Sequence, residues 1–503
     1  MCQAKPHSQN WLCHFGVRES CSRFNGVSSG RGVERKTWSS AHHRVKSGGK
    51  TAALQNFQGE RLANGSESKK KPLAEGARGK RVISGMRPTG RLHIGHYFGA
   101  LQNWVRLQND LSYECFYFIA DWHALTSDYA DTSGVAQNVI EIATDYLAVG
   151  LDPKKCVIFQ QSQIPEHAEL HLLLSMVTPL GWLERVPTYK EALENVKDKD
   201  LHTYGFLGYP ILQCADIVIY SDEGKTLVVP VGEDQVSHVE VTREIVRRFN
   251  THFGLRIDSK LFREGKEDLA IIWGDQFGKL LGGSRTASGD IDENWRTAHE
   301  QHLRAHVAEI GIRNFLDTIG KHQEGYFSFD YVLIEPEAML TQTPRIPGLD
   351  GRKMSKSYGN AIMLTESDAD IRAKTKVMVT DPARKRRSDP GNPDVCPVYD
   401  WHKLFSPPET LKWSAEGCRT AGIGCIECKA AMADNLIKWI APIRERRLHY
   451  QGQEKLVRRF IQEGSVQARV VAQQTMVRVR DAVFGKDRVR RRSLRPLRKH
   501  QAG

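Results

Sequence analysis

The stretch RVISGMRPTGRLHIGH, residues 81–96, decides the fold class of this chain. Residues 81–85 are largely apolar and predict a short buried strand, and residues 85–90 turn the chain into a helix that starts near His93. Residues 135–150 have the spacing of an amphipathic helix. Further strands are predicted by three short apolar segments, at residues 116–120, 156–160 and 227–231. Short strands that alternate with helices predict an α/β fold with a doubly wound parallel sheet.

Polar residues follow these strands, at the edge where sheets of this class bind their ligands. DWH at residues 121–123 comes directly after the second predicted strand, and GEDQ at residues 232–235 follows the last one. We therefore expect a binding site beyond the carboxyl ends of the strands.

The strand patterns stop after about residue 365. Ser367 is placed to cap a helix that runs from Asp368 towards Val377, and residues 430–485 predict two or three amphipathic helices. The expected apolar stripes of these helices include Val466, Val470, Val471, Met476 and Val477. The sequence thus predicts a helical C-terminal domain.

The formal net charge of +13 lies in the two ends of the 503-residue chain. Residues 1–80 have a net charge of +10 and residues 486–503 one of +7, which leaves −4 for the rest. The first segment predicts a disordered basic tail or an organelle transit-like extension, and the second a basic, solvated tail. No apolar run reaches the roughly 18 residues of a membrane span, so we expect a soluble protein.

Two motifs far apart in the sequence have residue types that suit phosphate chemistry. LHIGH, residues 92–96, places His93 and His96 about one turn apart at a helix start, where free N–H groups favour phosphate. KMSKS, residues 353–357, follows the glycine-rich PGLDGR and offers two lysines on a flexible loop. Alone, the first would suit a metal-binding or capping pair and the second a solvated surface loop. Together they indicate an adenylate-forming site that closes on ATP from two sides.

The pair resembles the HIGH and KMSKS signatures of class I aminoacyl-tRNA synthetases. Four intervening motifs are similar to those of tryptophanyl-tRNA synthetases: DWHA at 121–124, ERVPTYK at 184–190, GYPILQCAD at 208–216 and VPVGEDQ at 229–235. Tyrosine enzymes usually have GGxDQ in place of the last. The resemblance implies a Rossmann-like catalytic domain at 81–254 and 331–364, and a helical tRNA- and anticodon-binding domain at 365–485.

The family's functional residues have counterparts at matching positions. The resemblance implies ATP contacts at Arg87, Pro88, Thr89, Gly95, His96, Gly232, Glu233, Asp234, Gln235, Ile346, Lys353, Met354, Ser355, Lys356 and Ser357. It implies catalytic roles, with Mg²⁺ at the β- and γ-phosphates, for Lys353, Lys356, Lys190, His93, His96 and Gln235. It implies tryptophan contacts at Asp216, Tyr209, Gln213 and His123, of which Asp216 would accept the indole N–H. A buried carboxylate of this kind rejects phenylalanine, which leaves it unsatisfied.

The implied reaction is ATP-dependent attachment of tryptophan to its tRNA through a tryptophanyl-adenylate. Three alternatives stay open: a tyrosyl-tRNA synthetase, an HxGH-type nucleotidyltransferase, and a paralogue that binds RNA without charging it. The family also implies a homodimer. We expect the cytoplasm, or an organelle matrix if the N-terminal segment is a transit peptide.

Four cysteines cluster in the C-terminal region with the spacing C-x21-C-x6-C-x2-C: Cys396, Cys418, Cys425 and Cys428. Clustered thiols in an intracellular enzyme suggest a metal, either zinc or a 4Fe–4S cluster, although unrelated buried cysteines would give the same pattern. A bacterial subset of the family has a 4Fe–4S cluster with similar spacing, and this resemblance favours iron–sulfur.

Residues 255–330 depart from the family pattern. Family members pass almost directly from FG at 253–254 to EPEAML at 335–340, whereas about 80 residues intervene here. Within them, residues 270–273 predict a strand and residues 300–316 a helix. This atypical insertion could be a subdomain, an arm that contacts RNA or a partner, or translated non-coding sequence.

Overall fold

The computed structural model of the chain describes residues 79–196, 199–258, 293–319, 324–341 and 346–485. The predicted strand at 270–273, the C-terminal tail at 486–503 and residues 1–78 of the N-terminal tail lie outside these described residues.

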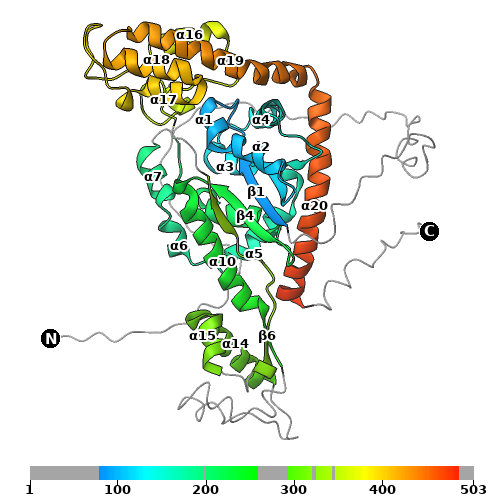
Figure 1. The fold of residues 1–503 in the computed structure, drawn as a ribbon. Coiled ribbons are helices and arrows are strands. Elements are labelled where there is room, and N and C mark those ends of the chain that lie inside the picture. Colours follow the sequence, from blue (N-terminus) through cyan, green and yellow to red (C-terminus); the bar gives the residue numbers. More distant parts are fainter. Residues whose placement is uncertain (1–78, 197–198, 259–292, 320–323, 342–345, 486–503) are drawn as a thin grey trace, which may run out of the picture. The chain divides into compact units, whose positions relative to one another are not determined.

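A five-stranded parallel sheet forms the centre of the described chain (Figure 1). Its strands are β1 (Lys80–Met86), β2 (Tyr113–Ile119), β3 (Cys156–Gln160), β4 (Thr226–Val231) and β7 (Glu337–Leu340). Their order is β3-β2-β1-β4-β7, and every pairing is parallel. The four strands expected from sequence and the parallel α/β class are confirmed. The strand order reverses between β1 and β4, which is where such sheets bind ligands.

Helices make up most of the connections between these strands. They are α1 (Ile94–His96), the π-helical turn η1 (Tyr97–Leu101), α2 (Gln102–Gln108), α3 (Asp121–Asp128), α4 (Val135–Val149), η2 (Gln161–Gln163), α5 (Glu166–Ser175), α6 (Leu180–Glu184), α7 (Pro187–Asn195), α8 (Tyr204–Leu207), α9 (Tyr209–Val218), η3 (Glu233–Gln235) and α10 (Val236–Gly254). The helix expected at 135–150 is therefore α4. It ends at Gly150, whose φ of 109° suits glycine.

Both faces of the sheet are buried, as expected for a parallel sheet. Successive strand residues point to opposite faces, so Val82 and Ile83 belong to two different apolar clusters. The first cluster continues into the C-terminal helices through Trp401 and Leu436. The second includes Phe249 of α10 and residues near the C-terminal end of the described chain.

The region after residue 365 is helical, as the sequence predicts. Its helices are α16 (Asp368–Lys376), η8 (Pro393–Val395), α17 (Pro397–Phe405), α18 (Pro408–Arg419), α19 (Cys425–Gln451) and α20 (Glu454–Phe484). Ser367 caps α16, because its hydroxyl accepts from the backbone N–H of Asp370 over 3.1 Å. Among the described helices, none is long and apolar enough to cross a membrane.

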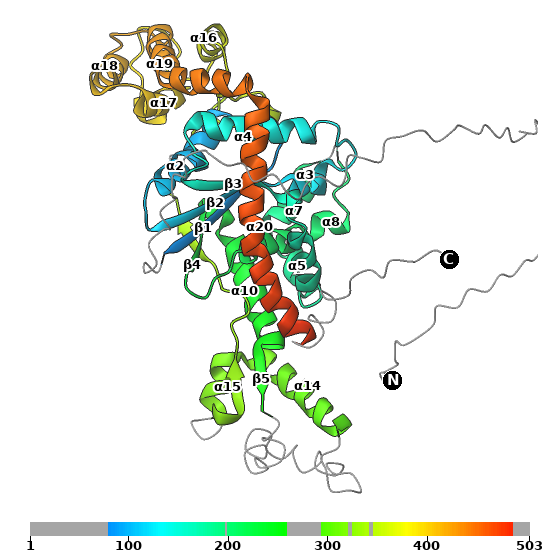
Figure 2. The same ribbon diagram turned by 90° about the vertical axis from the view of Figure 1, so that its right-hand side faces the viewer.

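The last helix, α20, runs along the sheet beside β3 (Figure 2). The backbone N–H of Gln160 donates to the Ser465 hydroxyl over 3.2 Å, and a Cβ on Gly464 would lie 1.9 Å from the carbonyl oxygen of Ile158. Such a close approach requires a face of small residues, formed by Gly464, Ser465, Ala468 and Ala472.

This contact corrects the expected apolar stripe of α20. Val466, Val470 and Val477 are 63, 51 and 49% exposed, whereas Met476 is fully buried. The sequence pattern favoured the large apolar residues as the buried face. The backbone-to-backbone approach at β3 instead selects the small ones. These three valines turn outward, whereas Val471 is half-buried against the second apolar cluster.

The described part of the predicted insertion contains an antiparallel pair, β5 (Leu255–Ile257) with β6 (Phe327–Phe329), and three helical segments. These are α14 (Glu293–Ile310), α15 (Ile312–Ile319) and η6 (Glu324–Tyr326). The helix expected at 300–316 is thus broken at Gly311, whose φ is 86°. Arg304 of α14 donates to the carbonyl oxygen of Leu255 over 2.6 Å, which ties α14 to the end of α10.

The close approach of α20 predicts that Gly464→Ala destabilises the protein. A Cβ at 1.9 Å from a backbone oxygen forces the helix away from the strand, and overpacking of this kind costs about 1–3 kcal/mol. The matched control is Gly181→Ala in α6, where a Cβ meets nothing within 4 Å. Urea unfolding should show a loss for the first variant and none for the second. Equal stabilities would contradict the contact.

Candidate active site

Backbone pairing joins the two sequence motifs. The N–H of Ile94 donates to the carbonyl oxygen of Ile362 over 3.0 Å, and the N–H of Leu364 donates to that of Leu92 over 2.9 Å. His93 and Met363 face each other in this short antiparallel bridge. The lysine loop, residues 353–357, is thereby seated against the segment that follows β1.

His93 and His96 form a tight pair at the start of α1. The N–H of His93 donates to Nδ1 of His96 over 3.2 Å, and the ring centroids lie 3.7 Å apart. Burial, and then the charge of Lys356, lower the pKa of His93 to about 4. Burial, followed by His93 and Lys356, lowers the pKa of His96 well below its usual value. Both imidazoles are therefore neutral at pH 7 and act as hydrogen-bonding groups rather than as cations.

Lys356 reaches from its loop to the turn after β1. Its Nζ donates to the carbonyl oxygens of Thr89 and Gly90 over 3.1 and 2.9 Å. Burial lowers the pKa of Lys356, and the negative charge of Asp145 opposes that shift. Met354 is buried next to Gly95, on which a Cβ would lie 3.4 Å from the Met354 sulfur. The two motifs are thus in contact through side chains as well as backbone.

Asn360 organises the lysine loop, although it belongs to neither of the two sequence motifs. Its Oδ1 accepts from the N–H of Ser355 over 2.8 Å. Its Nδ2 donates to Asp350 over 2.7 Å and to the carbonyl oxygen of Lys353 over 3.2 Å. This buried amide therefore fixes the backbone on both sides of Met354.

Asp216 of α9 is the centre of a second buried cluster. Nδ1 of His167 and Nε2 of His123 lie 2.5 and 2.9 Å from its two oxygens. The amide nitrogen of Gln161 donates to both oxygens, over 2.8 and 2.7 Å. Burial alone would raise the pKa of Asp216, but the charges and hydrogen bonds of His167 and His123 outweigh it and lower the pKa to about 2. The carboxylate is ionised and accepts from all three neighbours.

Three residues of this cluster were missed from the sequence. Gln161 follows β3 directly and His167 lies at the start of α5. His171, one turn later on α5, has a buried Nδ1 without a hydrogen-bond partner. Their place after a strand end was the available signal, since polar residues there face the ligand edge.

The remaining predicted residues lie at or near the carboxyl ends of the strands. Arg87 and Thr89 are exposed in the turn after β1, and Gly232 caps η3 after β4. The hydroxyl of Tyr209 lies 2.5 Å from that of Thr188. The other predicted site residues differ in their exposure to solvent. Pro88 and Ile346 are buried, and Gln213, Gln235 and Ser355 are half-buried. The exposed ones are Glu233, Lys190 and Lys353. The side chains of Asp234 and Ser357 lie outside the described part of the structure.

The four clustered cysteines lie close together without forming a metal site. Burial, and then the charges of Cys396, Cys418 and Cys425, raise the pKa of Cys428 to about 12. Within the described residues, however, no group of three or more His, Cys, Asp or Glu side chains is arranged to hold a metal ion. The thiols influence one another electrostatically, but the ligand geometry expected from their spacing is not present.

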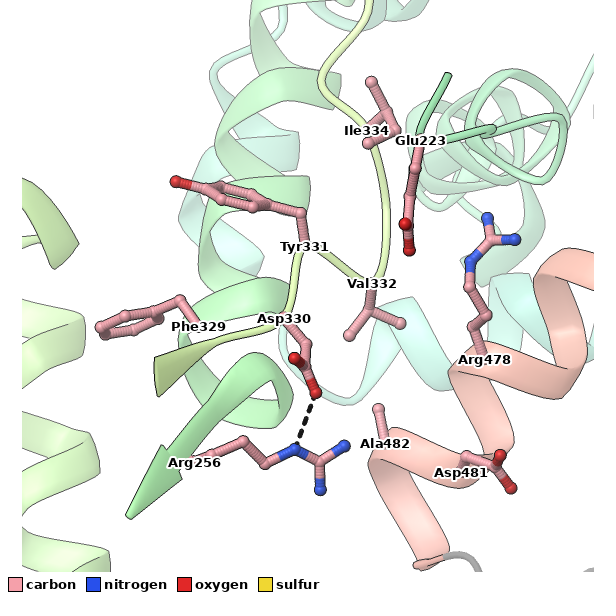
Figure 3. A pocket seen from close by; sticks show the side chains of 10 residues that line it. All are labelled: Glu223, Arg256, Phe329, Asp330, Tyr331, Val332, Ile334, Arg478, Asp481 and Ala482. Atoms are coloured by element: carbon pink, nitrogen blue, oxygen red, sulfur yellow. Dashed lines mark hydrogen bonds and ion pairs between the residues drawn. The ribbon is translucent and has the colours of Figure 1, made fainter. Parts of the chain in front are cut away.

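A separate pocket lies near the base of the predicted insertion (Figure 3). Arg256 donates to Asp330 over 2.8 Å at its rim. Its lining consists of Glu223, Arg256, Phe329, Asp330, Tyr331, Val332, Ile334, Arg478, Asp481 and Ala482. It shares no residue with either motif or with the Asp216 cluster, so we place the active site at the strand ends.

The lowered pKa of His93 predicts a specific pH dependence of stability. In the unfolded chain this histidine takes up a proton near pH 6.5, whereas in the folded protein it stays neutral down to about pH 4. Its contribution to stability is therefore complete above pH 6.5 and is lost as the pH falls towards 4. Denaturant unfolding at several pH values should show that the free energy of unfolding falls less steeply with decreasing pH in His93→Gln than in the wild type. The difference in slope should be up to about 1.4 kcal/mol per pH unit. The exposed His202→Gln is the control, and an unchanged slope in His93→Gln would contradict the shift.

Comparison with known proteins identifies the family of the chain. The model of the family described as tRNA synthetases class I (W and Y) matches residues 77–265 and 312–441. The chain is 48% identical over 404 residues to a tryptophan–tRNA ligase from Ralstonia nicotianae, an alignment that covers 80% of this chain and 98% of the relative. It is 43% identical to the tryptophan–tRNA ligase of Thermotoga maritima, with the same coverage.

The solved structures agree with the sequence relatives. A tryptophanyl-tRNA synthetase from Campylobacter jejuni, complexed with ADP and tryptophan, is 26% identical with a TM-score of 0.56. That similarity covers 80% of this chain and 98% of the other. The chain therefore belongs to the class I tRNA synthetases of the tryptophan and tyrosine group, and its relatives place it among the tryptophan–tRNA ligases.

Proposed function

We propose that the chain attaches tryptophan to its tRNA in two steps, with ATP as the energy source and tryptophanyl-adenylate as the intermediate. The observation that supports this best is the backbone pairing of residues 92–94 with residues 362–364, which seats the lysine loop against His93 and His96. The relatives are named tryptophan–tRNA ligases, and the C. jejuni enzyme was solved with ADP and tryptophan.

ATP binds between the two motifs in this proposal. Its phosphates lie near the N-terminus of α1 and the lysine loop, and its adenosine extends towards Ile346 and the turn at Gly232–Gln235. Lys356 exchanges its bonds to Thr89 and Gly90 for phosphate oxygens, and Lys353 and Lys190 add positive charge beside Mg²⁺. The neutral imidazoles of His93 and His96 donate N–H groups without repelling the lysines.

The first step requires alignment rather than a covalent enzyme intermediate. The ionised carboxylate of tryptophan attacks the α-phosphorus in line, an O–P bond forms, and the bond to the pyrophosphate oxygen breaks. Charge develops on the leaving pyrophosphate, which is where the lysines lie. A ribose hydroxyl of the terminal adenosine of tRNA, the 2′ hydroxyl in class I enzymes, then attacks the carbonyl of the adenylate. An ester bond forms, the bond between the carbonyl carbon and the phosphate oxygen breaks, and AMP leaves with the hydroxyl proton released.

Asp216 provides the specificity for the indole ring. An ionised carboxylate has about four acceptor positions, and His167, His123 and Gln161 make four contacts with them. The indole N–H takes the place of one of these contacts, while Tyr209, Gln213 and His123 complete the pocket. Phenylalanine has no N–H to offer in exchange, and a hydrogen bond lost at a buried carboxylate costs about 1–3 kcal/mol.

The other assignments rest on family membership and on surface features. We propose the helical region at 365–485 as the tRNA- and anticodon-binding part, residues 255–330 as an insertion into the catalytic domain, and the cytoplasm as the place of action. The exposed Leu172, Met176 and Leu180 on α5 and α6 are a suitable surface for a homodimer.

Tryptophan-dependent ATP–pyrophosphate exchange tests the proposed activity. We expect exchange with tryptophan and at least about 100-fold less with tyrosine or phenylalanine. Lys356→Ala should lower the rate at least about tenfold with little change in melting temperature, because its amine acts on the leaving group. Exchange that depends on tyrosine would favour the tyrosyl alternative. Absence of exchange with all three amino acids would favour a non-charging RNA-binding paralogue.

We further propose that Cys396, Cys418, Cys425 and Cys428 hold a 4Fe–4S cluster, with zinc as the alternative. Four soft thiols within electrostatic range of one another suit either metal, and Arg384 donates to the Cys418 sulfur over 3.9 Å, which offsets negative charge. The thiols would have to move closer together to bind it. Such a centre would cross-link the start of α19 to the segments that precede it.

Metal analysis of anaerobically purified protein tests this assignment. We expect a brown protein with broad visible absorption and about four irons per chain, and loss of both in Cys425→Ser and Cys428→Ser. Cys115→Ala, at a buried cysteine of β2, is the matched control and should keep the metal. A colourless protein with one zinc would support the alternative, and a metal-free protein would overturn both.

A further inference from the structure

Helix α19 extends three arginines to two segments, α4 and the chain that follows the lysine loop. Arg447 donates to Asp145 of α4 over 2.6 Å, and Arg446 donates to the carbonyl oxygen of Ala148 at the end of the same helix over 2.6 Å. Arg444 donates to the carbonyl oxygen of Glu366, beyond the lysine loop, over 2.9 Å. A single C-terminal helix thus contacts both α4 and the segment that follows the lysine loop.

The contact between Arg447 and Asp145 leads to the histidine motif. Asp145 is fully buried, and while one of its oxygens accepts from Arg447, the other accepts the backbone N–H of Leu92 over 2.8 Å. Leu92 immediately precedes His93. The charged groups around this carboxylate are Arg447 of α19, Glu141 of α4, which pairs with Arg447 and with Arg91, and Lys356 of the lysine loop.

The contact between Arg444 and Glu366 leads to the other strand of the bridge, residues 362–364. The carboxylate of Glu366 accepts the backbone N–H of Met363 over 3.0 Å and pairs with Lys374 over 2.7 Å. Met363 faces His93 in the antiparallel bridge. Arg444 and Arg447, one turn apart on α19, therefore hold the two strands of the bridge that unites the ATP site.

A buried ion pair contributes little net stability to a protein. Desolvation of a carboxylate and a guanidinium costs several kcal/mol, and well-packed apolar residues are often as stable. The useful property of the pair is its fixed geometry: the carboxylate bonds the guanidinium on one oxygen and Leu92 on the other. Its position therefore sets the position of the histidine motif.

We infer that α19 is a clamp that aligns the two halves of the ATP site, with Asp145 and Arg447 as positioning residues for adenylate formation. Neither residue touches ATP or tryptophan in the proposed function on which this inference rests. Their contribution is to hold the Leu92 N–H, and hence His93 and His96, in register with the lysine loop.

Two double variants separate positioning from stability. Asp145→Asn with Arg447→Gln removes both charges but keeps an amide oxygen for the Leu92 N–H and a donor–acceptor pair between the side chains. Asp145→Leu with Arg447→Leu also removes both charges and leaves the Leu92 N–H without an acceptor. We expect tryptophan-dependent exchange within about threefold of wild type for the first and at least tenfold lower for the second. The KM for tryptophan should stay within about twofold in both.

Equal exchange rates for the two folded double variants would overturn the inference and leave the pair as structural only. If the leucine variant does not fold, Arg444→Gln provides the second test, with an expected rise of about threefold or more in the KM for ATP alone. Its matched control is Arg372→Gln, because Arg372 pairs with Asp434 of α19 from α16 and touches neither strand of the bridge. Identical kinetics for these two variants would also overturn it. Lack of exchange in the wild type would instead refute the proposed function.

Discussion

The antiparallel bridge between residues 92–94 and 362–364 is the interaction on which the rest of the site depends. Its two strands are about 270 residues apart in sequence, and each borders one of the phosphate-binding motifs. The parallel sheet positions one strand of the bridge, because the histidine motif follows the end of β1. The C-terminal helices position the other strand, because they contact the segment that follows the lysine loop. The sheet alone would present only half of the site.

Two buried carboxylates of the catalytic region show how the surroundings of an acid decide its behaviour. Asp145 and Asp216 are both fully buried, yet burial raises the pKa of Asp145 despite Arg447, while His167 and His123 hold that of Asp216 near 2. Asp216 accepts from three side chains, so its charge is satisfied before any ligand arrives. Asp145 relies on one guanidinium and one backbone N–H. Removal of Arg447 would therefore raise the pKa of Asp145 further, whereas the carboxylate of Asp216 stays ionised.

Much of this architecture could be predicted from local sequence, and the reasons are physical. Runs such as 156–159 are apolar at every position because both faces of a parallel strand are buried, and a serine such as Ser367 is a good cap at the start of a helix. The apolar face of α20 could not be predicted, because the contact with Ile158 selects small residues over large ones. Gln161 and His167 were missed because their roles depend on Asp216, about 50 residues away in sequence. Asn360 was missed because its bonds to Asp350, Lys353 and Ser355 depend on the loop's backbone conformation. Metal binding by the four cysteines stays a prediction. Their spacing in sequence gives the number of thiols but does not determine whether the sulfur atoms come together around one metal centre.

Helix α19 unites two features that the sequence presents separately. It begins at Cys425 and Cys428 and reaches Arg444 and Arg447 about five turns later, after Pro442 has interrupted its hydrogen bonding. If a ligand of the helical region displaces α19 and its arginines, it alters the affinity for ATP, and ATP alters the affinity for that ligand by the same factor. Under the proposed function, in which these helices bind tRNA, this reciprocity links tRNA binding to the geometry in which the adenylate forms.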